Sequence, residues 1–387
     1  MDAVRKTHLF AGLFRIPSRW KNVLYLHIPF CVQRCDFCIY FSKVPSSRAE
    51  IDDFVSGELL PRLDEYVSPL ELAPFDEVYF GGGTPTTLSP AQIELICGRI
   101  PRFGEIPFRA LEASPKTIRK EHVEVLAQLG FGYISLGVQT RDTETLAAHN
   151  REIVPERRLA EIVDWIEGAG MIANLDLICF LKSGSIDDAA QIDADLAWVM
   201  EDLRPTSITV HSEYRARKSI AKQIAMVRSI RHACTRSGLY SCTNSLLEPA
   251  DFESDMRRGA EYRLMRRDKD FSFHLLGKLP AALRFGHNVL AVGEYDRFPL
   301  RTNYLHVSNR LAEGNVIELV REARANEAEL TRVRLRLGLT ARDWSRDDAY
   351  FDRAEDEHRF YEVLRAAKLP DLALPLAALT GALGAHS

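Results

Sequence analysis

The sequence lacks a long apolar run and an excess of either charge. No stretch of its 387 residues approaches the roughly 18 consecutive apolar residues of a membrane-spanning helix, and the apolar segment Leu372 to Leu383 is interrupted by Pro375 and Gly381. Fifty Lys and Arg stand against 54 Asp and Glu, a formal net charge of −4. No overall positive field therefore points to a nucleic-acid partner.

The first 20 residues also lack the unbroken apolar core and small-residue cleavage site of a signal peptide. The chain has seven cysteines, an odd number in a long sequence, which argues against a framework of disulfides. We therefore expect a cytoplasmic protein with no membrane span. The composition, 46% hydrophobic and 27% charged, is that of a chain with a folded core.

Short apolar or β-branched runs alternate with longer stretches of helical periodicity from about Val23 onward, which favours parallel strands joined by helices. Six parallel strands are too few for a closed eight-stranded barrel, so the pattern predicts an α/β fold with an open, partial (β/α)6 TIM-like barrel. The predicted strands are Val23 to Ile28, Glu77 to Phe80, Phe108 to Glu112, Tyr133 to Gly137, Ala173 to Phe180 and Ser207 to His211. The predicted helices are Arg48 to Tyr66, Pro90 to Arg99, Pro115 to Leu129, Val154 to Ala169, Asp187 to Leu203 and Lys218 to Arg236.

The alternation ends after about Leu246, where charged and mixed segments follow. We therefore predict three parts: an N-terminal extension (1–20), the partial barrel (21–245) and a smaller C-terminal α+β region (246–387) that serves as a substrate or accessory region.

Three cysteines, Cys31, Cys35 and Cys38, lie in a C-x3-C-x2-C pattern directly after the first predicted strand. Thiolates suit zinc and iron-sulfur clusters. A structural zinc site needs four ligands. A 4Fe-4S cluster bound by three cysteines instead keeps one iron without a protein ligand, where a substrate can bind.

This loop and its flanks resemble the radical S-adenosylmethionine (radical SAM) superfamily, and within it the oxygen-independent coproporphyrinogen III dehydrogenase-like subfamily. Four further segments agree in order, so that the resemblance covers roughly residues 20 to 215. They are Phe80 to Thr86 (FGGGTPT), Leu111 to Pro115 (LEASP), Ile134 to Gln139 followed by Asn150-Arg151, and Asn174 to Ile178 (NLDLI).

The resemblance implies an iron-sulfur enzyme with a 4Fe-4S cluster and S-adenosyl-L-methionine (SAM). Such a metal-binding oxidoreductase reductively cleaves SAM to a 5′-deoxyadenosyl radical, which abstracts hydrogen from a biosynthetic intermediate. The overall reaction would be an oxidation like that of coproporphyrinogen dehydrogenase, or the tailoring of a natural product. The implied cluster ligands are Cys31, Cys35 and Cys38. The implied SAM contacts are Tyr25, Phe37, Gly82, Gly83, Thr84, Glu112, Gln139, Arg151 and Asp176. The implied partners are a small-molecule substrate and a one-electron reductant such as flavodoxin or ferredoxin.

The sequence departs from the subfamily where Asp176-Leu-Ile is followed by Cys179-Phe180-Leu181-Lys182 in place of Tyr-Gly-Leu-Pro. That segment belongs to the substrate side of the implied cavity. Two alternatives to hydrogen abstraction from a porphyrinogen-like intermediate therefore stay open: radical transfer of a methyl or methylene group from SAM, and a non-catalytic heme chaperone. No catalytic side chain is assigned, and histidines such as His211 are expected to be hydrogen-bonded core residues.

Overall fold

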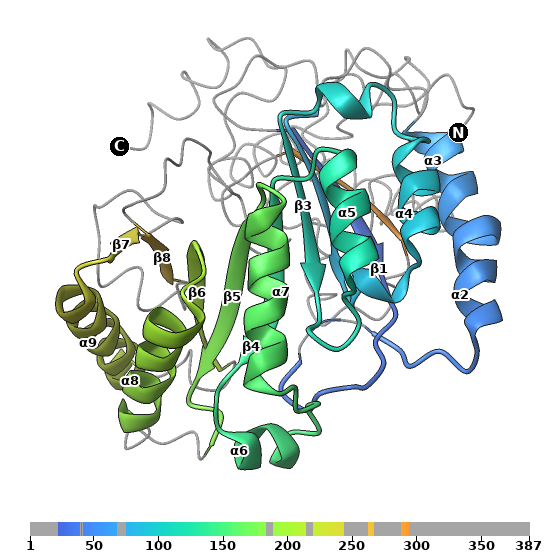
Figure 1. Ribbon diagram of the computed structural model, residues 1–387. Coiled ribbons are helices and arrows are strands. Elements are labelled where there is room, and N and C mark those ends of the chain that lie inside the picture. The colour runs from blue at the N-terminus through green and yellow to red at the C-terminus, as the bar shows by residue number, and fades with distance from the viewer. Residues whose placement is uncertain are drawn as a thin grey trace, which may run out of the picture.

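The fold is a mostly parallel sheet covered by helices (Figure 1). A computed structural model of the chain describes residues 22–38, 40, 42–67, 75–182, 189–213, 220–243, 262–266 and 288–293. In these ranges nine strands form one sheet in the order β7-β8-β6-β5-β4-β3-β2-β1-β9. The strands are β1 Asn22–Ile28, β2 Glu77–Gly82, β3 Phe108–Ala113, β4 Tyr133–Gln139, β5 Ile172–Cys179, β6 Ser207–Ser212, β7 Tyr240–Thr243, β8 Tyr262–Arg266 and β9 Asn288–Gly293.

Strands β1 to β6 are parallel neighbours in chain order, as the sequence predicts. The end strands β7 and β9 are not paired with each other in the described ranges, so the sheet is open there and the partial barrel is confirmed. Most of the helices lie in the segments that connect one parallel strand to the next. They are α2 Arg48–Phe54, which continues through a π-helical turn (Val55–Leu59) into α3 Leu60–Tyr66, then α4 Pro90–Cys97, α5 Lys120–Gln128, α6 Thr143–Ala148, α7 Glu156–Gly168, α8 Ala189–Trp198, which continues into a π-helical turn at Val199–Leu203, and α9 Ile220–Ser237.

One predicted helix start is wrong. The dipeptide Ser114-Pro115 looks like an N-cap followed by proline, but α5 begins only at Lys120. The carbonyl of Ser114 instead accepts the backbone N–H groups of Thr117 and Ile118, which makes a turn before the helix. At Ser89 the same kind of dipeptide does start α4, because Gln92 completes a capping box there.

Two strands of the predicted C-terminal region (246–387) lie within the described residues, and both belong to the barrel sheet. Strand β9 pairs in parallel with β1, from Asn22 opposite Asn288 to His27 opposite Gly293. Strand β8 pairs antiparallel with β6 and β7. The predicted extension (1–20) and most of 246–387 lie outside the described residues, so the three-part division stays a prediction.

The core lies between the sheet and the covering helices. Helix α7, for example, buries Leu159, Ile162, Val163 and Ile166, which recur at the three- and four-residue spacing of one helix face. Each such side chain contributes about 1.5 to 3 kcal/mol on burial. This rigid packing fixes the carboxyl ends of the parallel strands relative to one another.

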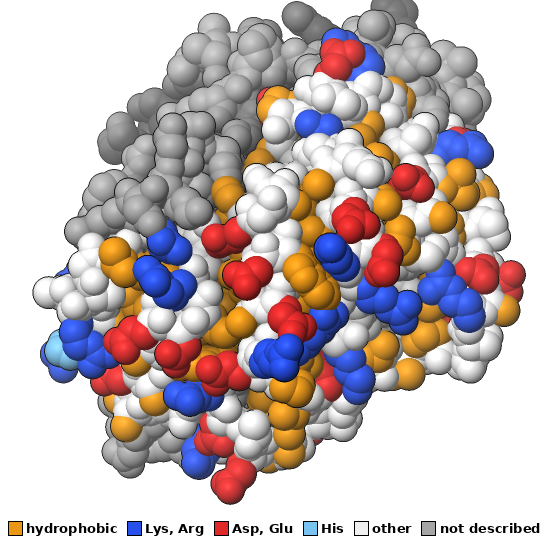
Figure 2. All heavy atoms as spheres, viewed as in Figure 1, with side chains coloured by type: hydrophobic (Ala, Val, Ile, Leu, Met, Phe, Trp, Pro, Cys, Tyr) orange, Lys and Arg blue, Asp and Glu red, His pale blue; other side chains and the backbone are white. Residues whose placement is uncertain are grey.

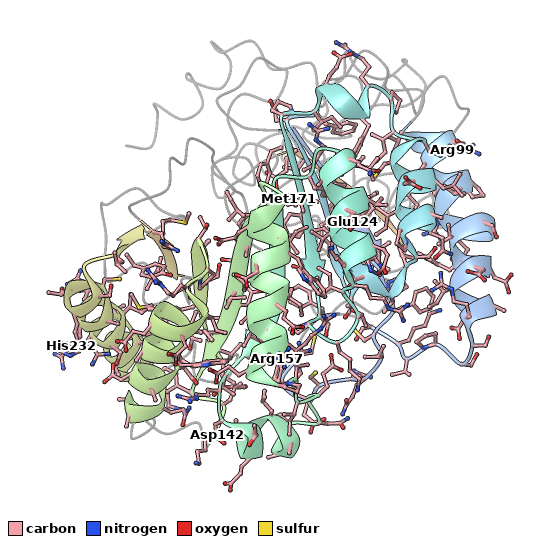
Figure 3. The ribbon with its side chains drawn as sticks, in the orientation of Figure 1. Arg99, Glu124, Asp142, Arg157, Met171 and His232 are labelled. Atoms are coloured by element: carbon pink, nitrogen blue, oxygen red, sulfur yellow. The ribbon has the colours of Figure 1, made fainter. Side chains whose placement is uncertain are left out.

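The outer faces of the helices are charged and mixed in sign. Figure 2 shows basic and acidic side chains interspersed over the face in view. In Figure 3, Glu124 and Arg157 are exposed helix residues of this kind, and Arg99 is an exposed residue in the turn after α4. Several are paired, as in the 2.8 Å contact between Arg99 Nη1 and Asp64 Oδ2. Among the described residues, no helix has the length and apolar character needed to cross a membrane.

Candidate active site at the carboxyl ends of the strands

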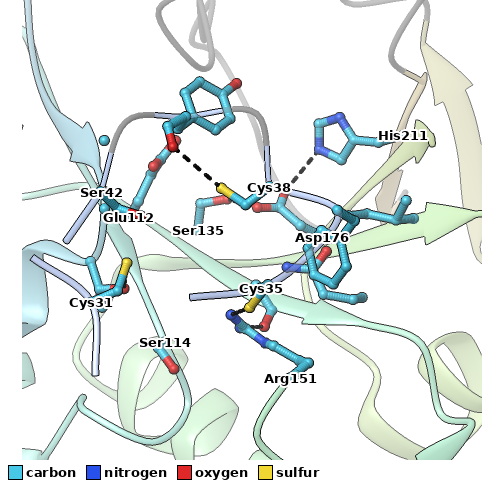
Figure 4. A pocket seen from close by; sticks show the side chains of 18 of the residues that line it. Cys31, Cys35, Cys38, Ser42, Glu112, Ser114, Ser135, Arg151, Asp176 and His211 are labelled. Carbon is cyan, nitrogen blue, oxygen red and sulfur yellow. Dashed lines mark hydrogen bonds and ion pairs between the residues drawn. The ribbon is translucent and has the colours of Figure 1, made fainter. Parts of the chain in front are cut away.

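A pocket lies where β1 to β6 end, and residues from or just after each of these strands line it (Figure 4). Parallel strands bring their carboxyl ends to one edge of a sheet, which is where barrel-type folds place their reactive groups. Except for Tyr25, all the predicted site residues line this pocket: Cys31, Cys35, Phe37, Cys38, Gly82, Gly83, Thr84, Glu112, Gln139, Arg151 and Asp176.

Tyr25 is buried behind the pocket. Its hydroxyl lies 3.2 Å from His27 Nδ1, and its ring stacks on Tyr79 with ring centres 6.2 Å apart. The Tyr79 hydroxyl in turn donates to Glu112 Oε1 at 3.1 Å. Tyr25 therefore supports a pocket residue through Tyr79 and does not itself line the pocket.

The cysteine loop is tied down at both ends by its backbone. Cys31 donates its N–H to the carbonyl of Lys43 at 2.9 Å, and Lys43 donates to Pro29 at 2.7 Å. Within the loop, Cys38 donates to the carbonyl of Cys35 at 3.1 Å, a tight turn. These bonds turn the loop so that all three thiols line the same pocket.

Each of the three thiols is free of disulfides and has its own polar neighbour. Thr84 Oγ1 lies 3.4 Å from Cys31 Sγ, Arg151 Nη1 lies 3.5 Å from Cys35 Sγ, and the carbonyl oxygen of Tyr40 lies 3.9 Å from Cys38 Sγ. Burial raises the pKa of the Cys31 thiol, although hydrogen bonds from Thr84 and Ser42 act in the opposite direction. A bound metal would therefore have to displace the proton from this thiol.

The donor set fits an iron-sulfur cluster. Three soft sulfur donors share one pocket, and Arg151 supplies a hydrogen bond to one of them. In the described part of the chain, no group of three or more His, Cys, Asp or Glu side chains is placed as the ligands of a single ion would be. A cuboidal cluster has a different requirement, because its cysteines bind different irons and need not converge on one point.

Gly82 and Gly83 hold the end of β2 against β1. At Gly82 the backbone φ is +106°, and an added Cβ would lie 2.6 Å from the His27 ring. At Gly83 an added Cβ would lie 2.7 Å from the carbonyl oxygen of Phe30, the residue before Cys31. The glycines are therefore required for the close approach that fixes the cysteine loop, and they also expose backbone to the pocket.

Arg151 and Gln139 meet at the end of β4. Arg151 donates one guanidinium nitrogen to the carbonyl of Gly137 and another to Cys35 Sγ. Gln139 has a left-handed backbone, with φ of 76°, where the pairing of β4 with β5 shifts by a residue. This irregularity turns Gln139 toward the pocket that Arg151 also lines.

Asp176 is a buried carboxylate held from three strands. Ser135 Oγ on β4 donates to its Oδ2 at 2.9 Å, and Asn174 Nδ2 on β5 donates to its Oδ1 at 2.9 Å. His211 Nε2 on β6 lies 3.5 Å from the same Oδ1. The burial of the Asp176 carboxyl group is thus compensated by several hydrogen-bond partners.

Several residues that line the pocket are not predicted from the sequence, including Ser42, Ser135, Ile178, Ser212 and Glu213. The alternation of side chains along strands could have found Ile178, which is two residues from Asp176, and Ser135, which is four residues from Gln139. His211 is a hydrogen-bonded core residue, as expected, and it also lines the pocket.

Part of the chain is similar to known proteins. The profile of the radical SAM superfamily matches residues 25–195. An oxygen-independent coproporphyrinogen III oxidase of Synechocystis is 32% identical over 161 residues, which is 40% of this chain and 34% of that protein. The heme chaperone HemW of Escherichia coli is 33% identical over 173 residues, 43% of this chain and 44% of that protein. The chain thus spans less than half the length of these curated relatives.

The solved structure of coproporphyrinogen III oxidase (HemN) from Escherichia coli shares the fold, with a TM-score of 0.55 and 22% identity over 74% of this chain and 66% of that one. The family of the matched domain implies a 4Fe-4S cluster and SAM, for which the pocket supplies suitable donors. Residues 25–195 therefore match the radical SAM superfamily, and this part of the chain is similar to the oxygen-independent coproporphyrinogen III oxidases and to HemW.

Proposed function

We propose that the chain is a radical SAM oxidoreductase that acts on a small biosynthetic intermediate, in a reaction like that of the coproporphyrinogen III dehydrogenases. The observation that carries this proposal is the convergence of three thiols, a glycine segment, three carboxylates and a guanidinium on one pocket. When bound, the cluster supplies the electron that cleaves SAM to a 5′-deoxyadenosyl radical able to abstract hydrogen.

Cys31, Cys35 and Cys38 are the proposed cluster ligands. Arg151 donates to Cys35 Sγ, so its positive charge would stabilise the thiolate and the charge of the cluster. Thr84 contacts Cys31 from the glycine segment, which places that segment beside the cluster loop. A ligand bound at an iron in this loop would therefore lie against the backbone of the glycine segment.

Two of the carboxylates, Glu112 and Asp176, suit different parts of SAM. An added Cβ at Gly81 would lie 3.2 Å from Glu112 Oε2, so Glu112 is beside the glycine segment and is the better partner for the amino group. Asp176 lies on β5 and suits the ribose hydroxyls, because an ionised carboxylate accepts hydrogen bonds from them. Arg151 and Gln139 would then face the carboxylate end of the cofactor.

The walls of the pocket include apolar side chains that would limit the access of water. Phe37, within the cysteine loop, lines the pocket and makes an edge contact with His149 at 5.8 Å between ring centres. Ile178 lines it from β5. Exclusion of water and of stray hydrogen donors is what a reactive carbon radical requires of its enclosure.

Anaerobic reconstitution tests the proposal. The purified chain, loaded with iron and sulfide and reduced with dithionite, is expected to convert SAM to 5′-deoxyadenosine, measured by mass spectrometry. Cys38→Ser should abolish both the cluster absorbance and the product. Cys234→Ala, which changes a buried cysteine of α9 outside this pocket, should leave both unchanged. A wild-type protein with an intact cluster and no cleavage of SAM would refute the proposal.

The likeness to HemW supports a second candidate, a heme chaperone. The same reconstituted protein distinguishes the two, since a chaperone would bind heme stoichiometrically without cleaving SAM. Transfer of a methyl group would be marked by S-adenosylhomocysteine among the products. Candidate tetrapyrroles offered to the reduced protein, with the products identified by mass, would then test the substrate class.

A further inference from the structure

We propose that His211 is a positioning residue for Asp176, and that its Nε2–H donor sets the affinity of the pocket for SAM. The inference rests on the proposed function, because it takes Asp176 as a contact of the SAM ribose. Neither the three-cysteine loop nor the glycine segment takes part in it. The evidence is a polar network that crosses strands β4, β5 and β6 beneath the pocket.

The register of the sheet brings these side chains together. On β6, the alternate residues Ser207, Thr209 and His211 share one face, and Thr209 is paired with Asp176 while His211 is paired with Ile178. All three β6 residues are buried. The buried face of β6 that lies beside Asp176 is therefore polar. Apolar side chains at these positions would supply no hydrogen-bond donors to this network.

Asn174 fixes the direction of the hydrogen bonds. Ser207 Oγ and Thr209 Oγ1 donate to its Oδ1 at 2.8 and 2.9 Å. Its Nδ2 must then point the other way, where it donates to Asp176 Oδ1 at 2.9 Å and to Ser135 Oγ at 3.0 Å. The amide is consequently held in one orientation, with its donors on Asp176 and Ser135.

The same reasoning fixes the proton on His211. Both carboxyl oxygens of Asp176 already accept hydrogen bonds, Oδ1 from Asn174 and Oδ2 from Ser135. The contact with His211 then requires Nε2 of the ring to be the donor. At 3.5 Å this bond is at the long limit, and contacts of this kind shorten when a ligand binds.

His211 is the bulkiest of the groups that contact Asp176, and like Ser135 it also lines the pocket. Figure 4 shows its ring beside Asp176, on the opposite side of the pocket from Cys31. A donor here orients Oδ1 and leaves the remaining acceptor positions of the carboxylate for ribose hydroxyls. Without it, the carboxylate can rotate away from the position that the hydroxyls need.

Three variants test the proposal through SAM binding to the cluster-loaded protein, measured by anaerobic calorimetry. His211→Phe removes the donor and should weaken SAM binding about tenfold. His211→Gln puts an amide N–H near the place of Nε2 and should retain most of the affinity. His122→Phe is the matched control, since His122 is a buried histidine outside this pocket that contacts the carbonyl of Leu88 at 2.9 Å. It should lower the melting temperature and leave SAM affinity unchanged.

A double-mutant cycle with Asp176→Asn separates positioning from direct contact. If His211 acts through Asp176, the double variant should bind SAM no more weakly than Asp176→Asn alone. Additive losses would overturn the inference, as would His211→Phe with wild-type affinity or His211→Gln as weak as His211→Phe. His211→Leu replaces the Phe variant if that protein does not fold. If the variants give such a result while the wild-type protein binds and cleaves SAM, only the role of His211 is refuted. Wild-type protein that fails to bind SAM would refute the proposed function as well.

Discussion

Gly83→Ala should destabilise the chain and reduce its capacity to bind a cluster. The new Cβ would lie 2.7 Å from the Phe30 carbonyl oxygen and 2.9 Å from that of Ile28, whereas carbon and oxygen normally stay about 3.3 Å apart or more. The end of β2 must therefore move away from these carbonyl oxygens by about 0.5 Å to restore a normal carbon–oxygen distance. Two short backbone bonds oppose this movement: Gly83 N to Ile28 O and Thr84 N to Phe30 O, both 2.7 Å.

The expected loss of unfolding free energy is roughly 3 kcal/mol, from overpacking of about 1 to 3 kcal/mol and two weakened hydrogen bonds of about 1 kcal/mol each. Denaturant unfolding measures this loss, and the iron content after anaerobic reconstitution measures the displacement of Cys31, which follows Phe30. Gly57→Ala is the control, because its Cβ would meet nothing within 4 Å and alanine favours a helix by about 0.5 to 1 kcal/mol. A Gly83→Ala protein with wild-type stability and iron content would refute the reasoning.

Three further predictions follow from individual side chains. Burial raises the pKa of Asp195 to about 6 from 3.8, so the folded state binds a proton more tightly than the unfolded chain, and the free energy of unfolding should fall by about 2 kcal/mol as pH rises from 4 to 6. Asp195→Asn should lack this decline in pH-dependent urea unfolding, and an unchanged decline would contradict it. Arg151→Met removes a positive charge that donates to Cys35, so an EPR-monitored titration should give a more negative cluster potential, and an unaltered potential would count against this contact. Tyr79→Phe leaves Glu112 without one donor and should cost about 1 to 2 kcal/mol in urea unfolding; a loss below about 0.5 kcal/mol would show that water replaces the hydroxyl.

The six parallel strands could be predicted from the sequence because each is a short apolar run followed by a stretch whose apolar residues recur with helical spacing. The observed strands differ from the predicted ones by only one or two residues at their ends, as where β2 extends to Gly82. The pairings of β8 and β9 could not be predicted in this way. Their partners lie far away in sequence, and no local pattern specifies which edge of a sheet a late strand will join.

The part of the candidate site that could be predicted from the sequence is the set of cysteines, because closely spaced cysteines suit few roles other than binding a metal or cluster. The spacing of Cys31, Cys35 and Cys38 points to a cluster by itself, and the structure brings all three to the pocket. Tyr25 lies on the same face of the sheet as Tyr79, on which its ring stacks, but it is not among the residues that line the pocket, so its contact with SAM stays a prediction. His211 could not be assigned, because its role depends on a carboxylate on the neighbouring strand.

The parallel pairing of β9 with β1 has a consequence for biosynthesis. The strand that leads into the cysteine loop gains its outer neighbour only when residues 288–293 have been made, more than 260 residues after β1 begins. Until then a growing polypeptide on the ribosome presents one side of β1 as an unpaired edge, which is a template for association with other chains. A nascent chain arrested before residue 288 should therefore depend on chaperones more strongly than one released after residue 293.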